Sequence, residues 1–98
     1  MSPAAAHLIV KGRVQGVFFR NSAKSTAEEL ALVGWVCNRS DRTVEIHAEG
    51  EKENLNRLIE WCHQGPPAAS VTSVIVDWMP PEGYHEFTIR REGIPPVG

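Results

Sequence analysis

Through Gly12-Arg13-Val14-Gln15-Gly16-Val17-Phe18-Phe19-Arg20 the chain passes from an apolar run, Leu8-Ile9-Val10, to a segment with helical periodicity. A glycine-containing turn between a strand and a helix directs main-chain N–H groups into one concavity, and the positive end of the helix adds to its attraction for an anion. Arg20 supplies a planar, permanently charged fork that matches phosphate oxygens two at a time. Because the spacing matches neither the dinucleotide nor the Walker fingerprint, the stretch by itself is compatible with an anion-binding loop or an ordinary connection.

The segments on either side of this stretch predict a strand and a helix. His7 to Val14 is expected to be a strand with one apolar face, which carries Leu8, Val10 and Val14. A helix is expected from a cap at Asn21 or Ser22, or from a capping box one turn later, to about Val33, with Gly34 as its C-cap. Its predicted buried stripe consists of Ala23, Ala27, Leu30 and Ala31.

Further along the chain, the pattern alternates between strand and helix. Trp35 to Asn38 and the alternating segment 44–49 predict an antiparallel hairpin with one face in solvent, broken at Gly50. A second helix follows, with an apolar stripe and a firm end at Gly65-Pro66-Pro67. The stripe consists of Leu55, Leu58, Ile59 and Cys62. Two further strands are expected at Val71 to Trp78 and His85 to Arg91.

The resulting order, β-α-β-β-α-β with an additional C-terminal strand, predicts an α+β ferredoxin-like sandwich. Two helices would pack on one face of a mostly antiparallel sheet, with the first and third strands adjacent in its middle. At 98 residues the chain is expected to be a single domain, 1–98, with irregular tails at 1–6 and 93–98.

Composition excludes several classes of function. A net charge of -2 gives no electrostatic reason to expect nucleic acid or an anionic membrane as partner, and no apolar run is long enough to span a bilayer. The two cysteines are expected to be free thiols in a reducing compartment, so we predict a cytoplasmic location; a monomer is a separate expectation. The four histidines share no spacing with metal ligands; we predict no metal and place them at the surface. They are His7, His47, His63 and His85.

A second stretch, Gly34-Trp35-Val36-Cys37-Asn38, adds a resemblance. Together with Gly12 to Arg20, it resembles the two signature segments of the acylphosphatase family, and the likeness extends over roughly Leu8 to Arg91. The resemblance implies hydrolysis of acyl phosphates to a carboxylate and inorganic phosphate without a metal or other cofactor. It further implies that Arg20 clamps the phosphate and that Asn38 orients the attacking water. The implied phosphate-binding loop provides the main-chain N–H groups of Gln15, Gly16, Val17, Phe18, Phe19 and Arg20.

Two positions depart from the commonest pattern of that family. Many members have glycine where Phe18 stands, and we infer an ordinary, negative φ there because a phenylalanine at positive φ would be strained. Phe18 and Phe19 are interpreted as apolar anchors of the loop rather than stacking surfaces. The turn between the two hairpin strands reads Asp41-Arg42 instead of Asp-Gly, which leaves its turn type open.

Two alternatives to the enzyme remain. One is a catalytically weak module of the same fold that binds phosphate or carbamoyl phosphate. The other is an RNA-binding ferredoxin-like domain, which stacks bases on aromatic residues of its central strands. The corresponding strands here contain no phenylalanine, tyrosine or tryptophan, and the second is acidic, so RNA binding is disfavoured.

Overall fold

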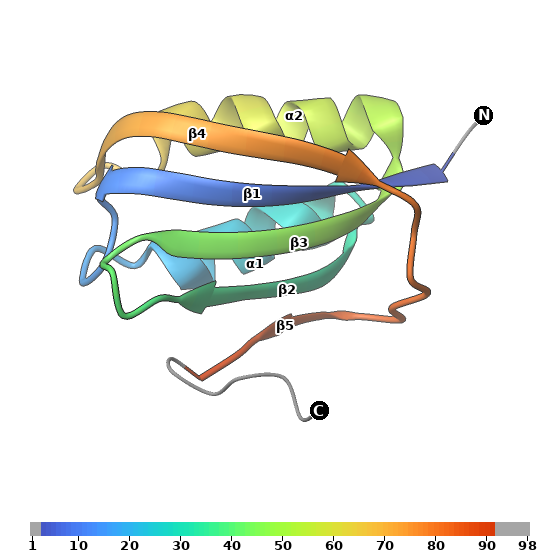
Figure 1. The fold of residues 1–98 in the computed structure, drawn as a ribbon, viewed down its shortest axis with the longest axis horizontal. Coiled ribbons are helices and arrows are strands. Elements are labelled where there is room, and N and C mark those ends of the chain that lie inside the picture. The colour runs from blue at the N-terminus through green and yellow to red at the C-terminus, as the bar shows by residue number, and fades with distance from the viewer. Residues whose placement is uncertain (1–2, 92–98) are drawn as a thin grey trace.

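The computed structural model describes residues 3–91, which form one five-stranded sheet and two helices (Figure 1). The strands are β1 (Pro3–Arg13), β2 (Val33–Asn38), β3 (Val44–Glu51), β4 (Ser70–Met79) and β5 (Phe87–Ile89), and the helices are α1 (Phe19–Glu29) and α2 (Lys52–Gln64). The sheet order is β4-β1-β3-β2-β5, and only β2 and β5 pair in parallel. The ferredoxin-like prediction is confirmed, including β1 and β3 as central neighbours.

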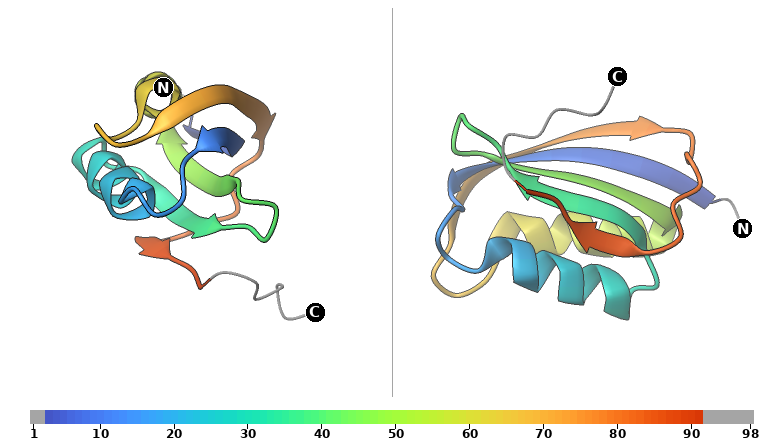
Figure 2. Two further views of the ribbon diagram at one scale, coloured as in Figure 1. Left: turned by 90° about the vertical axis from the view of Figure 1, so that its left-hand side faces the viewer. Right: turned by 90° about the horizontal axis from the view of Figure 1, so that it is seen from below.

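The hydrophobic core lies between the sheet and the helices, which cover the same face of the sheet (Figure 2). Alternate residues of the central strands point into it, because successive side chains of a strand face opposite sides. The fully buried set includes Leu8, Val10, Val36, Val44, Ile46, Ala23, Ala27, Leu55, Leu58 and Cys62. None of the helices described is long and apolar enough to cross a membrane.

β1 begins earlier than the sequence predicted. Residues 3–6, expected to be part of an irregular tail, pair with β3, from Pro3 opposite Glu51 to Ala6 opposite Ala48. Ala5 and Ala6 also pair with β4 and are fully buried. The alanines lack the alternation that marks a strand, but their main chain pairs with neighbouring strands. Residues 1–2 and the predicted tail at 93–98 lie outside the described residues.

The predicted ends of α1 are wrong at both termini. The helix begins at Phe19 with Phe18 as N-cap, and no side chain caps it, so neither Asn21 nor Ser22 has that role. It ends at Glu29, and the left-handed residue that follows is Ala31, at φ 56°. Gly34 lies instead in β2, where an added Cβ would stand 1.9 Å from the carbonyl oxygen of His47. That glycine allows two strands to approach closely.

The outer face of the hairpin is not fully in solvent. His47 and Glu49 are each 3% exposed, because the segment before β5 lies against them, with the Tyr84 ring 5.3 Å from the His47 ring. His47 Nε2 lies 2.7 Å from a Glu49 carboxylate oxygen, and that carboxylate accepts the main-chain N–H groups of residues 82–84. The surface position predicted for His47 is therefore wrong.

Candidate active site

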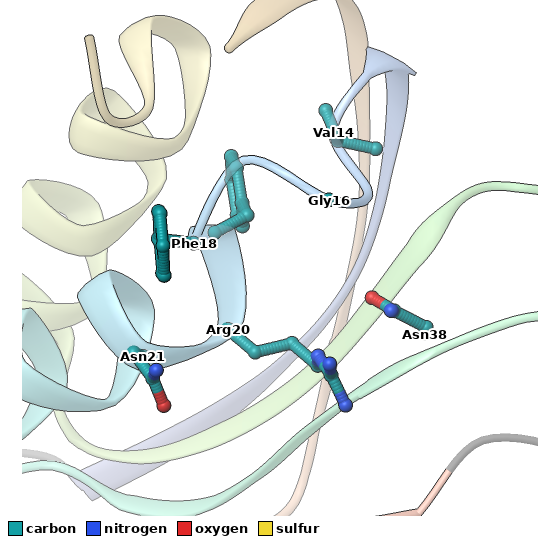
Figure 3. Close-up of a pocket in the computed structure, with 7 residues that line it drawn as sticks. Val14, Gly16, Phe18, Arg20, Asn21 and Asn38 are labelled. Atoms are coloured by element: carbon teal, nitrogen blue, oxygen red, sulfur yellow. The ribbon is translucent and has the colours of Figure 1, made fainter. Parts of the chain in front are cut away.

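A cavity of about 260 Å³ opens where β1 leaves the sheet, between the start of α1 and the end of β2 (Figure 3). Arg20 and Asn38, which are distant in sequence, both line it. Its full lining is Val14, Gly16, Phe18, Phe19, Arg20, Asn21 and Asn38. The fold thus brings together the two polar side chains that the resemblance singled out.

The loop from Gln15 to Phe18 has two residues in the left-handed region, Gly16 at φ 75° and Phe18 at φ 64°. Turns of this type point successive N–H groups into one concavity. Among the residues described, none of the N–H groups from Gln15 to Arg20 donates a hydrogen bond to another residue. Because main-chain donors are nearly always paired, a row of free ones beside a helix start indicates a site for an anion.

The two phenylalanines of the loop have opposite environments. Phe19 is 1% exposed and packs 5.2 Å from the Trp61 ring, so it is the apolar anchor that was expected. Phe18 is 77% exposed, and its positive φ contradicts the ordinary φ inferred from the sequence. The helix start fixed by Phe19 imposes this conformation on its neighbour. Left-handed backbone costs a non-glycine residue roughly 1–2 kcal/mol.

Arg20 lies in the first turn of α1 and is half-buried. Its guanidinium reaches across the cavity toward the end of β2 (Figure 3). Within the described part of the chain it forms no ion pair, and no carboxylate lines the cavity. The positive charge is therefore available to a bound anion.

Asn38 is the last residue of β2 and is 9% exposed. Its carboxamide oxygen is buried and has no hydrogen-bond partner among the residues described. Since buried polar atoms are generally satisfied, this oxygen is expected to gain a donor when the site is filled. The adjacent turn closes through a bond of 2.9 Å from the N–H of Arg39 to the carbonyl of Thr43.

The side chain of Gln15 ties the loop to this turn. Its Nε2 donates to the carbonyl of Arg39 at 2.8 Å and to that of Thr43 at 2.9 Å. Arg42 takes the positive φ, 73°, where the family often has glycine, and the Asp41 carboxylate accepts the N–H and hydroxyl of Thr43. Sequence reasoning assigned Gln15 only a main-chain role. It could not identify this contact, because the partners lie 24 and 28 residues away.

Not every predicted loop residue lines the cavity. Gln15 and Val17 do not, and the Val17 side chain is buried in the core. Asn21 does line it, although the sequence suggested only a capping role. Its position directly after Arg20, at the start of a helix, was the available signal.

Other reactive side chains lie elsewhere. Burial raises the pKa of the Cys62 thiol to about 12, and burial followed by the nearby Glu45 carboxylate raises the pKa of Cys37. Both cysteines are free, and neither lines the cavity. Among residues 3–91 there is no group of three or more His, Cys, Asp or Glu side chains placed to hold a metal ion. The polar side chains of the cavity are one guanidinium and two carboxamides.

A ferredoxin-like sheet that carries free loop donors, a single arginine and a buried carboxamide is typical of a small α+β domain with a site suited to an anion. The acylphosphatase family model matches residues 6–89. An acylphosphatase from Pelotomaculum thermopropionicum is 50% identical over 78 residues, which cover 80% of this chain and 85% of that protein. The chain belongs to the acylphosphatase family, and it is a hydrolase.

Solved structures agree with this assignment. The acylphosphatase from Coxiella burnetii superposes with a TM-score of 0.87 at 44% identity, covering 90% of this chain and 93% of that one. Full-length HypF, in its phosphate- and nucleotide-bound form, superposes with a TM-score of 0.85 at 27% identity. That match covers 94% of this chain but 12% of HypF, so the likeness is to one part of a much larger protein.

Proposed function

We propose that this acylphosphatase hydrolyses acyl phosphates in the cavity shared by Arg20 and Asn38, with the phosphate held by the main-chain N–H groups from Gln15 to Arg20. The observation that carries the proposal is the set of free N–H donors beside a guanidinium without an ion-pair partner among the residues described. Together they form a pre-arranged positive environment for phosphate oxygens.

The chemistry needs few side chains. The leaving group is a carboxylate whose conjugate acid has a pKa of about 4, so it departs without a proton and no catalytic acid is required. The transition state of phosphoryl transfer is loose and spreads negative charge over the peripheral oxygens. Positioning and electrostatic stabilisation, which the loop and Arg20 provide, therefore account for most of the catalysis.

Asn38 is assigned to the attacking water. Its unpartnered carboxamide oxygen is a suitable acceptor for one water proton, which would aim the water oxygen at phosphorus. The water oxygen then forms the new P–O bond while the bond to the acyl oxygen breaks, and the carboxylate leaves with the electron pair. The displaced water proton passes to a phosphate oxygen of the substrate itself, so no protein base takes part.

The direct test measures benzoyl phosphate hydrolysis by the purified chain in the presence of a chelator. We expect metal-independent turnover. In Asn38→Ala we expect kcat to fall about 100-fold, as for loss of one pre-arranged polar contact, while inorganic phosphate still inhibits competitively. Asn56→Ala, an exposed asparagine on α2, is the matched control and should keep full activity. If Asn38→Ala bound phosphate poorly yet turned over normally at saturation, the water-orienting role would be wrong.

A catalytically weak module that binds phosphate or carbamoyl phosphate is the second candidate, favoured by the likeness to part of HypF. The same assay separates the two candidates. A binding module would take up one equivalent of inorganic phosphate without multiple turnovers of benzoyl or carbamoyl phosphate.

We further propose that the protein acts as a cytoplasmic monomer. One chain supplies both Arg20 and Asn38 to the cavity. The free thiols of Cys37 and Cys62 suit a reducing compartment. Activity per chain should be independent of protein concentration across a range in which sedimentation detects a single monomeric species.

A further inference from the structure

Phe18 is the most exposed large hydrophobic side chain among the residues described, at 77%, and it lies at the rim of the catalytic cavity. The loop needs a left-handed residue at this position, a conformation that glycine adopts freely and phenylalanine does not. The ring does not compensate for this strain through burial, because Phe19 is the residue that anchors the loop in the core. Strained residues of this type cluster at functional sites.

The geometry of the reaction indicates what the ring faces. In an in-line displacement the attacking water and the leaving oxygen lie on opposite sides of phosphorus. Asn38, to which the water is assigned, lies on one side of the cavity, whereas Phe18 and Asn21 lie on the other (Figure 3). The acyl group of a bound substrate must therefore leave the cavity past Phe18.

Space for an acyl group is available in that direction. Asn21 lines both the cavity and a shallow groove of about 380 Å³ between the start of α1 and the end of α2. The groove is lined by Asn21, Ser22, Ser25, Thr26, Trp61, Gly65, Pro66 and Pro67. An acyl group larger than acetyl would thus have an apolar ring at the cavity rim and an open surface beyond it.

We propose that the Phe18 ring is the contact surface for the acyl half of the substrate and makes the enzyme prefer aromatic or bulky apolar acyl phosphates over acetyl phosphate. Phe18 is then a specificity-determining residue. Its main-chain N–H belongs to the phosphate loop, and its side chain contacts the acyl leaving group. This inference rests on the proposed function, because the direction of departure follows from the assignment of water to Asn38.

The test compares kcat/KM for benzoyl phosphate with kcat/KM for acetyl phosphate and follows their ratio, which cancels any common effect on the loop. The variants are Phe18→Gly and Phe18→Asn, since both residues tolerate the left-handed conformation. The ratio should fall by about three- to ten-fold in each, the usual contribution of an aromatic pair contact. Ile75→Thr, which changes an exposed apolar residue on β4, should leave the ratio unchanged.

A second measurement covers the case in which the variants lose turnover. The affinity for phenylphosphonate as a competitive inhibitor, divided by the affinity for inorganic phosphate, should fall in the same two variants. If neither the ratio of kcat/KM values nor the ratio of inhibitor affinities changed, the proposed role of the Phe18 ring would be wrong. The proposed hydrolysis of acyl phosphates would not be affected by that result. Absence of turnover of either substrate by the unaltered chain would instead overturn the proposed function and, with it, this inference.

Discussion

At the scale of single residues, Arg20 is the only charged side chain of residues 3–91 that lines the cavity. A guanidinium grips two phosphate oxygens at once, whereas an ammonium acts as a point charge. In Arg20→Lys we therefore expect KM to rise and kcat to fall together, for a combined loss in kcat/KM of about 100-fold or more.

Steady-state kinetics with benzoyl phosphate measures this loss. Arg57→Lys is the matched control, because Arg57 lies exposed on α2, where its guanidinium bonds to Glu53 four residues earlier. A lysine variant of Arg20 with unaltered kcat/KM would show that charge alone is sufficient.

The backbone of Phe18 permits a prediction about stability at the same scale. Glycine relieves the left-handed strain of about 1–2 kcal/mol but loses about 0.5–1 kcal/mol to greater freedom of the unfolded chain. Since the ring is 77% exposed, little burial is lost. In Phe18→Gly the free energy of unfolding should rise by about 0.5 kcal/mol, measured by urea denaturation. A fall of similar size would mean that the ring makes a stabilising contact.

At the scale of elements, Glu49 joins the segment before β5 to the central strands. Burial acts to raise the pKa of this carboxyl, but the hydrogen bonds from His47 and from the N–H groups of Glu82, Gly83 and Tyr84 outweigh it and lower the pKa below its ordinary value of 4.5. The folded state thus binds the proton less readily than the unfolded state. This contribution to stability is complete above pH 4.5 and is lost as pH falls through the lower folded pKa.

In Glu49→Gln we expect the free energy of unfolding at neutral pH to fall by about 2 kcal/mol, because a charged acceptor of several hydrogen bonds is lost. The decrease in stability on acidification should also be smaller than in the unaltered protein. Hydrogen exchange should increase at the Arg90 amide, which bonds to the Val36 carbonyl where β5 lies against β2. Glu60→Gln, an exposed carboxyl on α2, is the control. Equal acid sensitivity in the two variants would contradict this role for Glu49.

At the scale of the whole molecule, the fold keeps titrating groups out of the catalytic cavity. Among residues 3–91, no histidine, carboxylate or thiol lines it, and Arg20 is its single ionisable side chain. At saturating benzoyl phosphate, any change in kcat between about pH 5 and about pH 8 should therefore come from the phosphate of the substrate, whose second pKa is about 6, and not from a histidine. The variants His63→Gln and His85→Gln should have the same profile. A limb of the profile that disappears on replacing one histidine would reveal a protein base.

The order of elements was predictable from local pattern. The strand at β3, the apolar stripe of α2 and its Gly65-Pro66-Pro67 end are local patterns, and the structure confirms these elements, although the burial of β3 does not alternate as predicted. The ends of α1 were not predictable, because the burial of Phe19 against α2 determined where the helix starts. The strand at Ala4 to Ala6 likewise depends on neighbours on both sides rather than on its own residues.

The sequence by itself determined the ferredoxin-like order, the family, and Arg20 and Asn38 as the residues to examine, because periodicity and signature segments are local properties. Only the tertiary structure decided that those two side chains share a cavity, that Phe18 is left-handed and exposed, and that His47 and Glu49 are buried. Each of these features depends on contacts with residues that are distant in the sequence. Pairing across the sheet and the contacts from the segment before β5 set the burial and the backbone angles, and no short stretch of sequence contains this information.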